Sequence, residues 1–190
     1  MKENNKIRSF ICIHFPDEVI KEIARIQELI NNKVKFTGKL TELENLHLTL
    51  KFLGEIEEER LTQVKEKLQS IKFASFTAKL LNMGIFSYKK NPKVIWIKVG
   101  GKELFELQKQ IDNALKELFK PEERFMSHLT IARIKHMKDK TAFKQYLKNI
   151  SVKPIKFQVS SFELKSSELR PLGPVYNTIE EYNSKKEINK

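Results

Sequence analysis

The 190-residue sequence is poor in cysteine, in glycine and in long apolar runs. Its single cysteine, Cys12, excludes an internal disulfide and a thiolate metal cluster, and it fits a reducing compartment such as the cytoplasm. The six glycines form no Gly-rich phosphate loop, and the pair Gly100-Gly101 is only a turn signal. No apolar run approaches the roughly 18 residues of a membrane span, and the polar opening hexapeptide lacks the apolar region of a signal peptide. The sequence therefore predicts neither a membrane span nor secretion.

Aspartate is scarce as well, with Asp17, Asp112 and Asp139 as the only three. Hard cations usually recruit clustered carboxylates, and no such cluster is visible in the sequence, so we expect no metal. Basic residues are abundant: 36 Lys and Arg against 24 Asp and Glu give a net charge of +12. This charge either attracts a polyanion such as nucleic acid or forms a solvated surface without a partner.

The pattern of apolar residues predicts an α+β fold. A chain of 190 residues suits one domain or two intimately packed halves. Two consecutive pairs of strands have no helix between them, which favours antiparallel sheets over a doubly wound parallel sheet. We expect one domain over residues 1–183 and a polar, frayed tail over 184–190. The expected strands are 7–15, 46–53, 76–86, 94–99, 127–134, 155–164 and 175–179, and the expected helices 16–31, 57–71, 102–119 and 141–150.

Two short motifs repeat: His47-Leu48-Thr49-Leu50 and His128-Leu129-Thr130-Ile131. The chain has only four histidines and eight threonines. That two of the four histidines each have a threonine two residues later, with apolar flanks, is roughly a one-in-a-thousand coincidence. One motif alone is an ordinary half-buried strand, but the pair indicates an internal duplication that carries chemistry.

The spacing places each His and its Thr on one face of a strand, about 6.6 Å apart. If the two halves face each other across a cleft, two imidazoles and two hydroxyls converge. One neutral His can then take a proton from water while a protonated His gives one to a leaving oxygen, and the threonines can hydrogen-bond a tetrahedral anion. Zinc chemistry is disfavoured because neither motif has two His at ligand spacing. A serine hydrolase is disfavoured because there is no Gly-x-Ser-x-Gly elbow. The constellation therefore favours phosphodiester cleavage without metal.

Several further segments match a known family together with the two motifs. These segments are Arg8 to Ile11 with Pro16, residues 44–54, Phe125 to Arg133, and Ser167 to Tyr176. Over about residues 6–180 the chain resembles the two-histidine (2H) phosphoesterases, and more narrowly the bacterial and archaeal RNA 2′,3′-cyclic phosphodiesterases, once called 2′-5′ RNA ligases. Ser127 stands where the family often has proline, which affects only the local backbone.

The resemblance implies a two-lobed α+β fold, with antiparallel sheets, flanking helices and pseudo-twofold symmetry around a central cleft. It implies opening of a terminal RNA 2′,3′-cyclic phosphate to a 2′-phosphate, with 2′-5′ ligation as a possible reverse reaction. No metal and no other cofactor is expected. Carried over by position, His47 and His128 are the catalytic pair, with His47 activating water, and Thr49 and Thr130 hold the phosphate.

Three other residues are candidates for substrate binding. Arg133 stands at an odd offset from His128, so it reaches the cleft only if the strand ends, twists or bulges. There its guanidinium would bind phosphate. Lys51 shares the expected face of His47 and either binds phosphate or is solvated. Phe10 either stacks a base at the cleft or belongs to the core.

The predicted partners are RNA 3′ ends or small cyclic-phosphate nucleotides, with no membrane and no obligate protein partner, for a monomer in the cytoplasm. Two alternatives remain open at this stage. One keeps the chemistry but acts on small cyclic nucleotides or 2′-5′ oligonucleotides. The other is a non-catalytic nucleotide- or RNA-binding module. Against the second, a pure binder has no need of two imidazoles.

Overall fold

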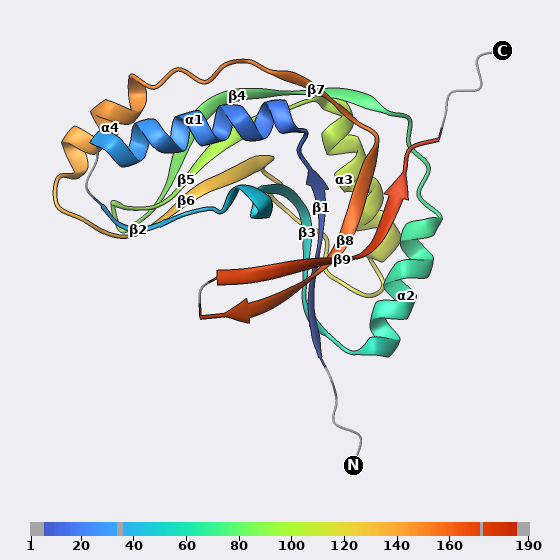
Figure 1. Cartoon of the computed structure of the whole chain (residues 1–190). Helices are drawn as coiled ribbons and strands as arrows, with labels where there is room; N and C mark the ends of the chain where they lie inside the picture. The colour runs from blue at the N-terminus through green and yellow to red at the C-terminus, as the bar shows by residue number, and fades with distance from the viewer. Residues whose placement is uncertain (1–5, 34–35, 172, 186–190) are drawn as a thin grey trace.

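The computed structural model of the protein describes residues 6–33, 36–171 and 173–185. It is an α+β structure in which one long, curled antiparallel sheet carries helices on its outer faces (Figure 1). Along the chain, the elements are β1 (Ile7–His14), α1 (Asp17–Lys33), β2 (Phe36–Leu40), the 3-10 helix η1 (Leu43–Asn45), β3 (His47–Ile56), α2 (Glu58–Gln69), β4 (Phe76–Tyr88), β5 (Asn91–Gly100), α3 (Lys102–Leu115), β6 (His128–Met137), α4 (Lys140–Lys148), β7 (Lys156–Val159), β8 (Ser161–Arg170) and β9 (Gly173–Asn183).

The sheet has two halves that repeat the same arrangement. Its strand order is β7-β4-β5-β6-β3-β1-β8-β9, with β2 added alongside β6. We call β3, β1, β8 and β9 the first half, and β6, β5, β4, β7 and β2 the second half. The halves meet where β3 pairs with β6 through Leu48 and Leu129 alone. The succession β1-α1-β3-α2 of the first half corresponds to β5-α3-β6-α4 of the second, so the expected two-lobed, pseudo-twofold fold is confirmed.

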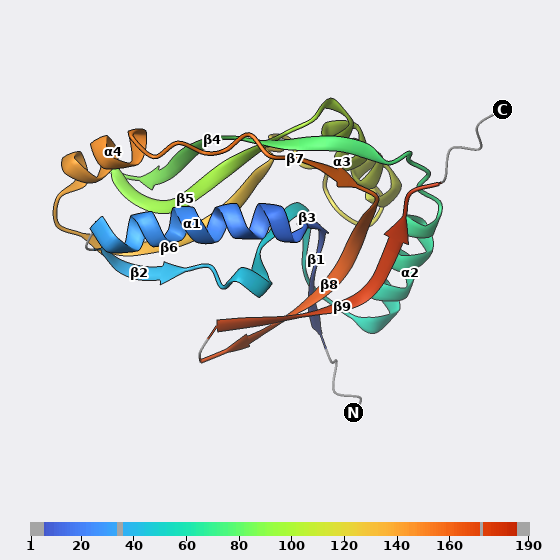
Figure 2. The same ribbon diagram turned by 45° about the horizontal axis from the view of Figure 1, so that its top comes forward.

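The long helix of each half packs against the central strand of the other half. Helix α1 follows β1 but contacts β6, whereas α3 follows β5 but contacts β3 (Figures 1 and 2). Helix α1 begins with the acidic pair Asp17 and Glu18, which suit the positive end of the helix dipole. Its inner face is a stripe of fully buried aliphatic residues spaced three or four apart, as an amphipathic helix requires. They are Val19, Ile23, Ile26 and Ile30.

Both central strands contain a β-bulge at the same position. In β3, Thr49 pairs with Cys12 but Lys51 pairs with Ile11, so Leu50 is an extra residue. The same shift occurs in β6 between Thr130 and Ala132, and the two strands have identical burial patterns. A bulge reverses which face later residues occupy. Residues after the bulge therefore point opposite to what simple alternation predicts.

The remaining differences from the predicted elements are local. Strand β2 was not expected, because it is short and its side chains are half-buried or exposed. The strand expected over 155–164 is two strands, β7 and β8, separated at Ser160. Of the expected polar tail, Ser184 and Lys185 donate backbone hydrogen bonds to Ser160 and Phe73. The rest, 186–190, lies outside the described residues. Across the described part of the chain, no helix is long and apolar enough to cross a membrane.

Candidate active site

The two motif histidines open the two central strands and are held in the same way. His47 is the first residue of β3 and His128 the first residue of β6. The Nδ1 atom of His47 lies 2.7 Å from the carbonyl oxygen of Asn45, and Nδ1 of His128 lies 2.7 Å from that of Met126. A carbonyl oxygen only accepts, so each Nδ1 carries a proton and donates it. Each ring therefore keeps Nε2 for the exchange of a proton with a ligand.

Both histidines and both motif threonines line one cavity of about 290 Å³ at the junction of the two halves. Because Leu48 and Leu129 point into the core between them, each His and its Thr face the cavity together. The β8–β9 hairpin supplies part of the wall through Pro174 and Tyr176. It reaches across the sheet beside β1 and β3 (Figures 1 and 2). The structure thus brings together the four side chains that the paired motifs single out.

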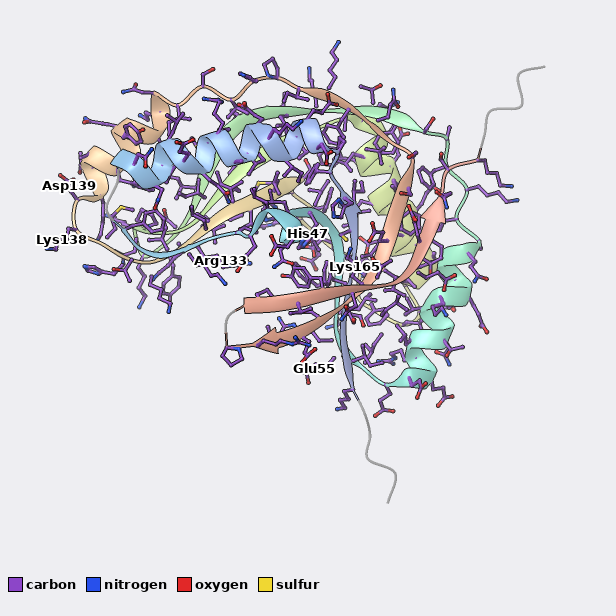
Figure 3. All side chains as sticks on the ribbon, viewed as in Figure 1. His47, Glu55, Arg133, Lys138, Asp139 and Lys165 are labelled. Carbon is purple, nitrogen blue, oxygen red and sulfur yellow. The ribbon has the colours of Figure 1, made fainter. Side chains whose placement is uncertain are left out.

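The environment of His47 favours its neutral form. Its ring lies 4.8 Å from that of Phe10 and 5.2 Å, edge on, from that of Tyr176. Burial lowers the pKa of His47 to about 4, from the ordinary 6.5. The hydrogen bond to Asn45 acts in the opposite direction, and the positive charge of Lys165 adds to the lowering. His47, Lys165 and Arg133 lie in the same region of the molecule (Figure 3). At neutral pH, the imidazole of His47 is therefore neutral.

His128 has an aromatic setting of its own. Its ring meets that of Phe86 edge on at 5.1 Å and lies 6.4 Å from that of Trp96. Phe86 and Trp96 pack against each other at 5.2 Å. Gly84 leaves room for this packing, since a Cβ atom there would collide with the Trp96 ring. Both imidazoles are thus fixed from behind by a hydrogen bond and from the side by aromatic rings.

The bulges bring Phe52 and Arg133 to equivalent positions, each five residues after a motif histidine. Arg133 lines the cavity, and the charge of its guanidinium is close enough to affect the pKa of both His47 and Tyr176. Phe52 lines the same cavity with 69% of its surface exposed. The two halves therefore differ at this position: one offers a cation and the other an aromatic ring.

Comparison with known proteins assigns the chain to a family. The family described as LigT like Phosphoesterase matches residues 13–96 and 98–176. The chain belongs to this family. An RNA 2′,3′-cyclic phosphodiesterase of Methanocaldococcus jannaschii is 37% identical over 93% of this chain and all of the relative. One from Thermotoga maritima is 34% identical over 92% and 94%.

Two solved structures share the fold. A crystal structure of a Thermus thermophilus protein is 27% identical, with a TM-score of 0.79, and the match covers 95% of this chain and all of that one. Escherichia coli LigT complexed with 3′-AMP is 20% identical, with a TM-score of 0.74 over 95% and 99% of the two chains, and it supports the fold alone.

Two of the expected binding residues of this LigT-like phosphoesterase are placed elsewhere. Lys51 is neither on the cavity wall nor solvated: the bulge turns it to the opposite face, where it is buried and paired with Asp112. Phe10 lies on the expected face but is 3% exposed and supports the ring of His47. It is therefore part of the core beneath the site and is not available to stack a base.

Other wall residues of the LigT-like phosphoesterase carried little signal in the sequence. Asn45 and Phe52 lie within the first matching segment, but nothing in their spacing marked them as wall residues. Phe86 comes from a strand without a motif, and Lys39 and Glu42 come from the unexpected β2 and the turn after it. Lys39 and Glu42 line the cavity because β2 pairs with β6 beside Arg133.

A second cavity of about 330 Å³ adjoins the first and shares Thr49, Phe52, Phe86 and His128 with it. Its far wall comes from the segment that precedes β6, through Glu122, Arg124, Phe125 and Met126. Of the four motif side chains, Thr49 and His128 thus line both cavities. Among the residues that the structure describes, no group of three or more His, Cys, Asp or Glu could hold a metal ion.

Proposed function

We propose that this LigT-like phosphoesterase opens 2′,3′-cyclic phosphates at RNA 3′ ends and leaves a 2′-phosphate, by acid–base catalysis between His47 and His128. The observation that carries the proposal is the matched geometry of the two rings. Each Nδ1 donates a hydrogen bond to a backbone carbonyl, which leaves each Nε2 available to a ligand. Both histidines and both motif threonines line the same cavity. One neutral and one protonated imidazole on either side of a phosphate are what an in-line displacement requires.

In the proposed reaction, Nε2 of neutral His47 takes a proton from a water molecule as the water oxygen attacks phosphorus. The bond between phosphorus and O3′ then breaks, and protonated His128 donates its Nε2 proton to O3′. With a pKa of about 4, His47 is unprotonated at neutral pH and so is free to accept the proton. The general base and the general acid each increase the rate roughly 10²–10⁴-fold. The ring opens, one water is consumed, and the histidines exchange protonation states, which solvent restores.

The threonines and Arg133 have electrostatic roles in this proposal. The hydroxyls of Thr49 and Thr130 donate hydrogen bonds to the non-bridging phosphoryl oxygens, which gain charge as water adds. The guanidinium of Arg133 on the same wall neutralises that charge. The exposed ring of Phe52 is available to stack a base next to the phosphate.

The substrate is proposed from the relatives and from charge. Several relatives that are at least 30% identical over most of the chain are named RNA 2′,3′-cyclic phosphodiesterase. The net charge of +12 favours binding of a polyanion such as RNA. We further propose that the protein is a cytoplasmic monomer that needs no metal.

Cleavage of 2′-5′ linkages, and its reversal, is a second candidate function. Such a linkage has a nucleoside on each side of the phosphate. The second cavity, of about 330 Å³, is lined by Thr49 and His128 but not by Arg133, and it offers room for that second nucleoside.

The test is hydrolysis, in EDTA, of a short RNA that ends in a 2′,3′-cyclic phosphate, with identification of the product isomer. We expect a 2′-phosphate from the wild type and a loss of at least about 100-fold in His47→Ala and in His128→Ala. His136→Ala is the matched control, because His136 is an exposed histidine on the same strand as His128. Activity that EDTA abolishes, or that survives in either motif variant, contradicts the proposal.

A further inference from the structure

Lys51 and Asp112 form a buried ion pair that the reaction does not use. Their side chains are 4% and 8% exposed. Lys51 belongs to β3, in the first half, four residues after His47, whereas Asp112 belongs to α3, the helix that the second half lends to the first. Burial alone would raise the pKa of Asp112, but hydrogen bonds from Lys51, the Glu122 N–H and Gln108 outweigh it and lower the pKa. The carboxylate is therefore charged at neutral pH.

The pair also holds the segment that leads to the second catalytic histidine. Lys51 Nζ donates to the carbonyl oxygen of Lys120 at 2.9 Å. Asp112 accepts from the backbone N–H of Glu122 at 2.9 Å and from the side chain of Gln108 at 2.7 Å. Four residues after Glu122 stands Met126, whose carbonyl fixes the ring of His128. The ion pair thus ties the strand of His47 to residues 120 and 122, and the backbone from Glu122 leads over four residues to the carbonyl that supports His128.

A neutral counterpart exists on the other side of the pseudo-twofold axis. Gln27 is a buried residue of α1, the helix that the first half lends to the second. Its side-chain amide donates to the carbonyl oxygens of Thr41, at 2.7 Å, and of Ile131, at 2.9 Å. Thr41 begins the segment that leads to His47, and Ile131 is the bulge residue of β6. Helices α1 and α3 therefore each form a hydrogen bond to the segment that precedes one of the two motif histidines.

We propose that Lys51 and Asp112 are positioning residues that fix His128 relative to His47 by tying the segment 120–126 to the first half of the molecule. This proposal deepens the proposed function and rests on it. A buried charge pair is costly to desolvate and adds little net stability over a well-packed apolar pair. Its three hydrogen bonds to other residues, Gln108, Lys120 and Glu122, define a geometry, which an apolar pair of similar size does not. Since misplacement by about 1 Å can cost about 100-fold in rate, the pair acts on kcat.

Two kinds of variant separate positioning from stability. In Lys51→Met or Asp112→Leu alone, the remaining partner is a buried unpaired charge, so we expect a lower melting temperature and a lower kcat. In the double variant apolar side chains fill the cavity and no charge is left unpaired; the backbone groups of the exposed residues Lys120 and Glu122 and the buried amide of Gln108 lose a partner. We expect its melting temperature to lie above that of either single variant. Its kcat stays about 10–100-fold reduced, with KM within about threefold.

Lys67→Met is the matched control. It breaks an exposed ion pair, 2.7 Å long, between α2 and Glu117 of the segment after α3. Exposed pairs contribute little, so we expect wild-type melting and kcat. A double variant that recovers both melting temperature and kcat overturns the proposal, as do single variants that lose stability with kcat unchanged below their melting temperature.

A readout independent of activity distinguishes this proposal from the proposed function. In ¹⁵N-labelled protein, the Nδ1–H signal of His128 reports its hydrogen bond to Met126. We expect this signal to shift or exchange faster in the double variant, while the Nδ1–H signal of His47 stays unchanged. A His128 signal identical to the wild type overturns the positioning role. A wild-type protein that fails to open the cyclic phosphate contradicts the proposed function, and the nuclear magnetic resonance result still stands.

Discussion

Removing the ring of Tyr176 should raise the pH at which catalysis fails on the acid side. The ring of Tyr176 meets His47 edge on at 5.2 Å and, with Phe10, keeps water from the imidazole. Burial is the main reason that the pKa of His47 is about 4. A general base works only when unprotonated, so kcat/KM falls as the pH drops through that pKa. In Tyr176→Ala, water reaches the ring, and the pKa rises towards its ordinary value.

The size of the effect follows from the two pKa values. At pH 5.5, a base with a pKa of 4 is almost fully unprotonated, whereas one with a pKa of 6.5 is only about one-tenth unprotonated. The wild type is therefore expected to keep nearly all of its neutral-pH kcat/KM at pH 5.5. Tyr176→Ala should move the acid limb upward by about one pH unit or more.

The assay is kcat/KM for a 2′,3′-cyclic phosphate substrate between about pH 4 and 8, since this ratio reports groups of the free enzyme. Circular dichroism at each pH verifies that the protein stays folded. The matched variant is Phe86→Ala, which removes the ring that faces His128 at 5.1 Å. It should leave the position of the acid limb unchanged. A wild-type acid limb near pH 6.5, or a limb that moves in Phe86→Ala and not in Tyr176→Ala, would refute His47 as the base.

Three further results are expected. Thr49→Val and Thr130→Val should each lower kcat/KM by at least about tenfold with unchanged melting, since each removes one hydroxyl donor to the phosphoryl group; equal rates in steady-state assays would contradict this role. Arg133→Ala should raise KM for the cyclic phosphate and weaken its salt dependence, while Arg133→Lys recovers part of the loss; a salt titration that matches the wild type would count against the contact. Ile26→Ala should cost about 2–5 kcal/mol in urea unfolding, because Ile26 is fully buried between α1 and the sheet; a loss below about 1 kcal/mol would show that α1 is not packed there.

The apolar pattern and the family resemblance predicted the fold, and the paired motifs predicted which four side chains come together. Strand alternation places His47 with Thr49 and His128 with Thr130, and the structure sets all four on one cavity. Alternation fails after the bulge, because an inserted residue is a property of strand pairing and leaves no mark in a single strand. Lys51 was therefore expected on the wrong face.

The limits of prediction elsewhere have similar physical reasons. Strand β2 has no buried side chain, so its segment lacks the alternation of apolar residues that marks a strand. Phe10 shares a face with polar neighbours, but the β8–β9 hairpin covers it through Tyr176, a contact between distant parts of the chain. Long-range coverage of this kind decides which residues of a face are exposed, and local sequence does not encode it.

The exchange of helices between the halves has a consequence for what a single chain permits. Because each half covers the other with its own helix, two separate copies of one half could assemble in the same way as a symmetric pair. Such a pair would carry the same residue at both positions that Phe52 and Arg133 now occupy. Because the two halves are joined in one chain, the residues at these two positions can differ. A near-symmetric cleft thereby acquires two unlike sides, with a guanidinium from one half and an aromatic ring from the other.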